Sequence, residues 1–105
     1  MDDDIVRERL HTLGLAGTRF DDLDAELLSD GRGLSSGERV RLILARALLA
    51  HVPLLILDDV AGVLDPDIRA QVARTLMREE GLAIIEATVD TPLLETTSRR
   101  IELGT

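Results

Sequence analysis

Two adjacent carboxylates follow a short and strongly apolar run of the chain. Residues 54–57 read Leu-Leu-Ile-Leu, and Asp58 and Asp59 come directly after them. An apolar run without alternation predicts a strand that is covered on both faces in a parallel sheet, and such sheets bind ligands at the carboxyl ends of their strands. Carboxylate oxygens suit Mg²⁺, and they can also polarise a water molecule. The pair therefore predicts either a hydrated cation or an activated water at this edge.

A second candidate site is the Ser-x-x-Glu box of the segment Leu34, Ser35, Ser36, Gly37 and Glu38. The Ser35 hydroxyl is expected to accept a hydrogen bond from the Glu38 amide, while the Glu38 carboxylate reaches back to the Ser35 amide. A helix that starts in this way presents free amides and the positive end of its dipole, which suit a phosphate group. The alternative is a purely structural capped helix, which is the more common meaning of so short a segment.

Two helices of the amino-terminal half are predicted from apolar residues that recur every three or four positions. Residues 3–13 form the first, with Gly14 as its C-cap. Residues 36–50 form the second, and its broad apolar stripe predicts deep packing. That stripe comprises Val40, Ile43, Leu44, Ala47 and Leu48. Between the two helices, residues 14–33 are interpreted as connecting loops with room for one weak turn of helix. An acidic run within them is interpreted as a solvated face rather than a metal site.

A third helix and a second strand follow the two carboxylates. Asp65 and Pro66 are typical of a helix start, as an N-cap and a proline at the first helical position, and Gly81 is expected to end this helix. Its predicted buried stripe comprises Ile68, Val72, Leu76 and Met77. Residues 82–85 then predict a strand parallel to residues 54–57, because a helix connects the two.

The carboxyl-terminal segment predicts two further short elements. Pro92 is expected to begin a short helical stretch, and residues 100–103 are expected to form an edge strand. No internal repeat, linker or low-complexity segment interrupts this order of elements. The alternation of strands and helices predicts an α/β fold with a parallel sheet.

Composition narrows the classes of function. The 105 residues allow one modest core, and the net charge of −8 with a single aromatic residue, Phe20, disfavours binding to nucleic acid or to anionic membranes. Cysteine is absent, which excludes disulfides and thiolate sites and fits a cytosolic setting. His11 and His51 lack metal-ligand spacing. No apolar run is long enough for a membrane span, so we expect no direct membrane insertion.

Every basic residue of the chain is an arginine. A phosphate loop of the G-x-x-x-x-G-K-[ST] type is therefore excluded within these residues, and so is Schiff-base chemistry on a lysine.

Taken together, these segments resemble the carboxyl-terminal half of the ATP-binding domain of an ABC transporter. Residues 34–38 resemble the signature loop of that family, LSGGQ, with Ser36 and Glu38 as departures. Residues 54–58 resemble its Walker B strand and acid, and the separation between the two segments is the one that the family normally shows. Asp59 lies where the family places its catalytic glutamate.

Two further segments follow in the order of the family. Residues 62–65, Gly-Val-Leu-Asp, resemble the loop usually written SALD, and residues 88–90, Thr-Val-Asp, lie where a Thr-His-Asp switch is expected. The approach to the signature loop, Gly-Arg-Gly at residues 31–33, looks more like exporter domains than importer subunits.

The resemblance implies a partial P-loop NTPase core of the RecA-like type, without the phosphate-loop strand. Residues 1–105 would be a single incomplete domain, in which residues 1–50 belong to the helical subdomain and residues 51–105 to the Walker B and switch portion of the core. In this family, two such domains meet head to tail with ATP and Mg²⁺ between them. They act with transmembrane domains at the cytoplasmic face of the cell membrane.

The resemblance also implies roles for individual residues. Asp58 would hold the magnesium shell, Asp59 would orient or deprotonate the attacking water, and Asp65 would signal across the interface between domains. Ser35 and Gly37 would face the γ-phosphate held by a partner domain. The residues implied to lie around the nucleotide are Leu34, Ser35, Ser36, Gly37, Glu38, Asp65 and Val89.

Two departures weaken the site that this chain would contribute for its own nucleotide. Asp59 is one methylene shorter than glutamate, and Val89 cannot donate a hydrogen bond to a phosphate. The signature segment, which would serve the partner, is nearly intact. This difference predicts the degenerate half of a heterodimeric exporter, whose isolated chain is inactive as an ATPase and binds ATP poorly.

Three other interpretations remain open. The chain could be a non-catalytic interaction module that completes a partner's ATP site, or a truncated fragment without function. A phospho-acceptor receiver domain would also place an acid after an apolar strand, but it needs a lysine that this sequence lacks. In each case we expect exposed apolar surface and self-association, because the strand at residues 54–57 needs a neighbour.

Overall fold

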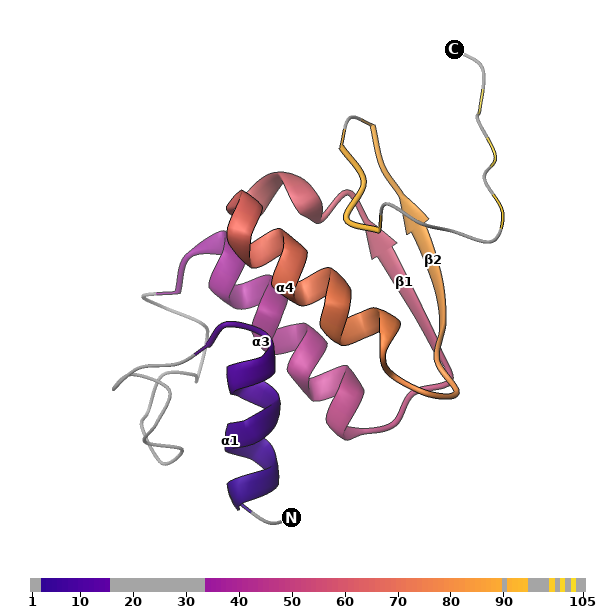
Figure 1. The fold of residues 1–105 in the computed structure, drawn as a ribbon. Helices are drawn as coiled ribbons and strands as arrows, with labels where there is room; N and C mark the ends of the chain where they lie inside the picture. The colour runs from indigo at the N-terminus through magenta and orange to yellow at the C-terminus, as the bar shows by residue number, and fades with distance from the viewer. Residues whose placement is uncertain are drawn as a thin grey trace.

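Two helices are followed along the chain by a strand–helix–strand unit, as the computed structural model in Figure 1 shows. The structure describes residues 3–15, 34–89, 91–94, 99, 101 and 103. Their elements are α1 (Asp3–Thr12), α3 (Ser36–Leu49), β1 (Leu54–Asp58), the 3₁₀ turn η1 (Ala61–Val63), α4 (Pro66–Met77) and β2 (Ala83–Ala87). The predicted α/β class is confirmed, and the arrangement is consistent with part of a P-loop domain.

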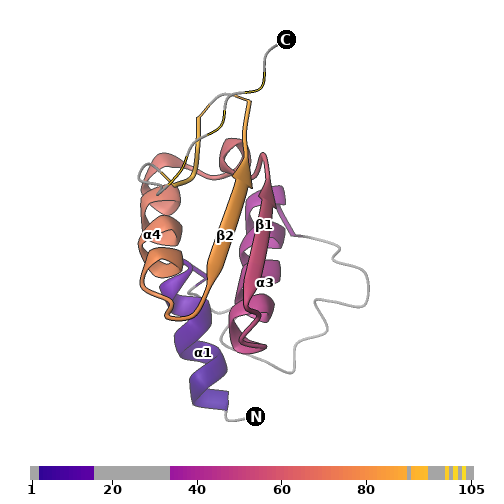
Figure 2. The ribbon, with the colours of Figure 1, turned by 90° about the vertical axis from the view of Figure 1, so that its right-hand side faces the viewer.

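The two strands pair in parallel, with Leu54 opposite Ala83 at one end and Asp58 opposite Ala87 at the other. α4 connects them, as predicted. The helices lie on one side of this sheet, and Figure 2 looks onto the opposite side. α1 contacts both α3 and α4, so the three helices pack together on one side of the sheet. Figure 1 shows that α1 lies on the side of α3 and α4 away from the strands.

The sheet has one covered face and one open face. Side chains alternate along a strand, so Leu55 and Leu57 point toward the helices, while Leu54 and Ile56 point away from them. The open side chains are 46% and 66% exposed, and Ile85 on β2 beside them is 57% exposed. The prediction that this strand is covered on both faces is therefore wrong for this chain, because no described element packs on its second face. The expected exposed apolar surface is confirmed.

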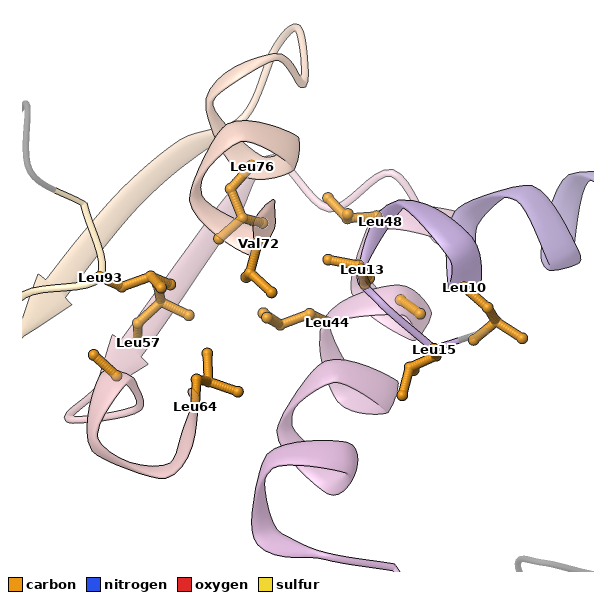
Figure 3. Close-up of a cluster of buried hydrophobic side chains, with 12 residues drawn as sticks. Leu10, Leu13, Leu15, Leu44, Leu48, Leu57, Leu64, Val72, Leu76 and Leu93 are labelled. Carbon is orange, nitrogen blue, oxygen red and sulfur yellow. The ribbon is translucent and has the colours of Figure 1, made fainter. Parts of the chain in front are cut away.

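The core lies between the covered face of the sheet and the helices, and it consists almost entirely of leucine. Figure 3 shows side chains from every helix and from β1 meeting there. The labelled members are Leu10, Leu13, Leu15, Leu44, Leu48, Leu57, Leu64, Val72, Leu76 and Leu93. Each of them is at most 5% exposed. Truncating such a leucine to alanine costs about 2–5 kcal/mol, so this cluster holds the helices in position on the sheet.

α1 ends in the way that its sequence predicts. Gly14 has φ +78°, its amide donates to His11 O at 3.0 Å, and the Leu15 amide donates to Leu10 O at 2.9 Å. This pair of hydrogen bonds is the Schellman arrangement, which favours glycine at the left-handed position. The C-cap prediction for Gly14 is confirmed.

Two residues that were predicted to lie in the buried apolar stripes of their helices are exposed. Ile43 is 60% exposed and Met77 is 57% exposed, although both were predicted to be buried. Each is adjacent in sequence to a fully buried leucine, Leu44 or Leu76, and neighbouring helical residues point about 100° apart. α4 also ends at Met77 rather than at Gly81, which instead adopts φ +76° in the turn before β2.

Several predictions concern residues that the structure describes only in part. The predicted loops lie mainly within residues 16–33, which are outside the described residues. Residues 92–94 are not helical, and residues 95–98 of the predicted helical stretch are not described. Ile101 and Leu103, from the predicted edge strand, are exposed and do not belong to the sheet of β1 and β2. Residues 100 and 102 are outside the described residues.

Candidate functional site

The start of α3 has the predicted capping box. Ser35 has extended backbone angles, φ −69° and ψ 164°, and its Oγ accepts a hydrogen bond from the Glu38 amide at 3.0 Å. The Ser35 amide in turn donates to Glu38 Oε1 at 3.0 Å. Ser35 and Ser36 are exposed, so this helix start lies at the surface, while the amide and the hydroxyl of Ser35 are both used within the box. Leu34, just before it, is half-buried and packs against the core.

Gly37 is not at the surface, although it was expected to face a phosphate. It is buried, and a Cβ built on it would be 2.6 Å from Val63 O. Only a residue without a side chain allows this approach of the η1 segment to the start of α3. This contact could not be predicted from the sequence, because residues 37 and 63 are in separate elements. The exposed part of the segment is therefore its first two serines.

An open groove of about 370 Å³ runs between the start of α3 and the segment that leads into α4. It brings together two of the segments that the sequence singled out independently, residues 34–38 and residues 62–65. Its lining comprises Ser35, Ser36, Gly37, Arg41, Val63, Leu64, Asp65 and Ile68. Polar side chains from Ser35, Ser36, Arg41 and Asp65 share this lining with the apolar side chains of Val63, Leu64 and Ile68.

Asp65 occupies the N-cap position of α4, and Pro66 the first turn, as predicted. Its backbone carbonyl accepts from the Arg69 amide at 2.7 Å, but its side chain makes no capping hydrogen bond. The Asp65 carboxylate is exposed beside the start of α3. Arg69 Nη2 donates to Leu64 O at 3.2 Å and so holds the preceding turn.

Asp58 and Asp59 lie at the carboxyl end of β1, as predicted, and both are exposed. Asp59 has φ +54°, a left-handed conformation that is uncommon for residues other than glycine but is tolerated by aspartate. Its amide donates to Ala87 O at 2.7 Å, so the end of β2 holds this turn. Backbone conformations of this kind are found often at functional sites.

These two carboxylates fit a partial shell for Mg²⁺. Among the described residues, no group of three or more acidic or histidine side chains could hold a metal by itself. Mg²⁺ is commonly bound by one or two carboxylates together with waters and substrate phosphates, which is what Asp58 and Asp59 could provide. Neither residue lines the groove at Ser35, so the two candidate sites are separate.

Val89 follows β2 and is 84% exposed, with an apolar side chain that offers no hydrogen bond. Beside it, Thr88 Oγ1 donates to Thr91 O at 3.1 Å and closes a tight turn. Asp90, the last residue of the predicted switch, is outside the described residues.

Glu86 holds the segment after this turn, and the sequence analysis missed it. Its Oε2 accepts from the Leu93 amide at 2.6 Å, and its Oε1 accepts from the Leu94 amide at 3.0 Å. Both leucines are buried. The available signal was an acidic residue within the apolar strand β2, where an ionised side chain needs partners.

Comparison with known proteins places these features in a family. The family model described as "ABC transporter" matches residues 2–62. The "ATP-dependent lipid A-core flippase" of Nitrosococcus oceani is 37% identical over 87 residues, which cover 78% of this chain and 15% of the flippase.

Two more relatives match shorter segments. The "Transport/processing ATP-binding protein ComA" of Streptococcus pneumoniae is 58% identical over 40 residues, 38% of this chain and 6% of ComA. The "Beta-(1-->2)glucan export ATP-binding/permease protein NdvA" of Rhizobium etli is 42% identical over 55 residues, 52% of this chain and 9% of NdvA.

The chain thus spans 15% or less of the length of these relatives. No solved structure matches it. Among the described residues, no helix is long and apolar enough to cross a bilayer. Because the family match covers more than half of the chain and the predicted signature and Walker B segments lie within it, the chain belongs to the ABC transporter family, as part of an ATP-binding domain.

Proposed function

We propose that the chain provides the signature side of a composite ATP site. The exposed Ser35 and Ser36 at the start of α3 contact the γ-phosphate of an ATP molecule that a second ATP-binding domain holds, in a head-to-tail pair. The observation that carries this proposal is the intact capping box at an exposed helix start, beside the exposed carboxylate of Asp65. The positive end of the helix dipole favours an anion at this position.

In its own half of the pair, the chain contributes a weakened site. Asp58 binds Mg²⁺ in this proposal, and Asp59 orients the attacking water from its turn at the end of β1. ATP with Mg²⁺ supplies the reacting phosphate, and the protein contributes position and charge. Val89 offers no hydrogen bond to a phosphate, and the side chain of Asp59 is short, so this site retains nucleotide rather than turning it over.

The wider assembly follows from the same proposal. The parent protein is a heterodimeric exporter in which this half is degenerate, and its ATP-binding domains act with transmembrane domains at the cytoplasmic face of the membrane. The phosphate loop of this half lies on a strand that is not among these residues. The open face of β1 and β2, with Leu54, Ile56 and Ile85 exposed, supports such a strand as the missing neighbour.

A fluorescent ATP analogue, mant-ATP with Mg²⁺, tests the proposal directly. It is titrated into the chain alone, into the complete ATP-binding domain of S. pneumoniae ComA alone, and into a mixture of the two. We expect no binding to the chain alone and tighter binding to the mixture than to the ComA domain. Ser35→Gly removes the hydroxyl with little cost at an N-cap, and we expect it to reduce the gain.

Two results would count against this function. Tight binding of mant-ATP by the chain alone would show a self-sufficient nucleotide site. An unchanged affinity of the ComA domain in the presence of the chain would remove the support for a shared site.

A further inference from the structure

Arg41 joins the end of α1 to the start of α3. Its Nη1 donates to Gly14 O at 3.0 Å and to Leu13 O at 3.4 Å, and its Nε donates to Gly37 O at 3.1 Å. These two carbonyls directly follow the last residue of α1, where the helix dipole is negative, so a cation is favoured there. A planar guanidinium can donate to Gly37 and to the end of α1 at once, because its nitrogens are spread over a plane. The ammonium of a lysine is a compact charge that cannot reach both acceptors.

The contact leaves no spare room. A Cβ built on Gly14 would be 3.1 Å from Arg41 Nη1 and 3.0 Å from Ile68 Cδ1. Gly14 is therefore closely enclosed by the guanidinium of Arg41 on one side and by Ile68 of α4 on another.

On its other side, Arg41 contacts the residue that follows the exposed serines. The carbonyl oxygen of Gly37 accepts a hydrogen bond from Arg41 Nε, and a Cβ built on Gly37 would point at Val63 O. Gly37 is thus fixed from two directions, by Arg41 and by the η1 segment. Because Ser35 and Ser36 directly precede Gly37, the direction of their amides depends on this position.

A second anchor of α1 serves as a comparison. Thr75 Oγ1 lies 2.6 Å from Thr12 O and 3.0 Å from Gln71 O, within α4, and its single hydroxyl hydrogen is shared between these two acceptors. It holds the same end of α1 as Arg41 does, but its hydrogen bonds lead to α1 and α4 and not to the start of α3. Removing it should loosen α1 without releasing Gly37.

We propose that Arg41 is a positioning residue for the ATP-contacting start of α3. By holding Gly37 relative to α1, it sets the direction in which Ser35 and Ser36 face a phosphate. The proposal rests on the proposed function, since it concerns the same site. The competing explanation is that Arg41 only stabilises the helical layer.

The test compares Arg41→Gln and Arg41→Lys with the matched control Thr75→Val, all in the full chain. Thermal unfolding measures stability, and hydrogen exchange follows the amides of Glu38 and Arg39, which are bonded to Ser35. The third readout is the affinity of each variant chain for the complete ComA ATP-binding domain, which is loaded with mant-ATP and Mg²⁺. If Arg41→Gln does not fold, Arg41→Lys is compared with Thr75→Val instead. Lysine keeps the positive charge but cannot donate to Gly37 and to the end of α1 at the same time.

We expect Arg41→Gln and Thr75→Val to lower the melting temperature by similar amounts. Only the Arg41 variants should speed exchange at Glu38 and Arg39, and Arg41→Gln should weaken the affinity about tenfold, with Arg41→Lys in between. Equal losses of affinity and equal exchange in the Arg41 and Thr75 variants would overturn the positioning role.

The exchange readout does not need a nucleotide, so the two proposals can fail separately. If the wild-type chain has no effect on the ComA domain, the proposed function fails. Faster exchange in the Arg41 variants alone would then still support the connection between α1 and α3, and unchanged exchange would overturn it.

Discussion

Gly37 packs against the carbonyl oxygen of Val63 so closely that a Cβ built on Gly37 would be only 2.6 Å from that oxygen. The start of α3 and the η1 segment therefore meet through backbone atoms. This relationship joins the signature segment to the loop before α4 within one chain, and it explains a glycine at a buried helical position.

Gly37→Ala should destabilise the fold. A helical alanine gains about 1 kcal/mol over glycine, but the clash with a backbone oxygen requires η1 to move, and we expect a net loss of about 1–2 kcal/mol. Urea unfolding measures the change, and Ser36→Ala, at the adjacent exposed position, is the control. Equal stability of the two variants would show that the contact is not tight.

His51→Gly should stabilise the chain. His51 has φ +53° after the end of α3, its amide donates to Leu48 O at 3.1 Å, and the Val52 amide donates to Ala47 O at 3.4 Å. This is a Schellman end with histidine where glycine is preferred, so we expect a gain of about 0.5–1 kcal/mol in the free energy of unfolding. His51→Ala, which keeps the strained Cβ, should show no gain. A loss of stability in His51→Gly would contradict the assignment.

Glu86→Gln should loosen the segment after the Thr88 turn. Both oxygens of the carboxylate accept backbone amides, whereas the glutamine side chain has one acceptor and must face the other amide with a donor. We expect a loss of about 1–3 kcal/mol and faster hydrogen exchange at Leu93 and Leu94. Glu80→Gln, at an exposed position, is the control. Unchanged exchange at both leucines would refute the tether.

The open sheet face should cause self-association. Ile56 and Ile85 are paired in register and are 66% and 57% exposed. The double variant Ile56→Thr, Ile85→Thr should shift sedimentation velocity toward the monomer without loss of helix content. Met77→Thr removes an equally exposed apolar residue from α4, away from the sheet, and should have no such effect. A monodisperse wild-type monomer with a cooperative melt would contradict the prediction.

The sequence predicted the features that depend on local spacing. The Ser35 box, the Gly14 end and the Pro66 start all follow from residue types within a few positions of one another. The parallel pairing of the two strands follows from the helix that connects them. Ile43 and Met77 were wrongly predicted to be buried. The sequence of a helix with a broad apolar stripe does not show which residues at the border of the stripe are covered, because that depends on the elements that pack against the helix.

Contacts between distant segments could not be predicted in the same way. The burial of Gly37 depends on Val63, the bonds of Arg41 depend on the end of α1, and those of Glu86 depend on Leu93 and Leu94. Each joins groups whose sequence neighbours carry no sign of the partner. The prediction that β1 is covered on both faces was wrong for a different reason. An apolar run without alternation predicts burial, but it does not say which segment covers each face.

The central claim is that the exposed start of α3 contacts an ATP molecule held by another domain. The most direct measurement uses Mn²⁺ in place of Mg²⁺ with ATP and follows paramagnetic broadening of the amide signals of the full chain by NMR. In the presence of the complete ComA ATP-binding domain, we predict the strongest broadening at Ser35 and Ser36, and its absence when that domain is left out. Broadening that spares Ser35 and Ser36 in the mixture would contradict the account.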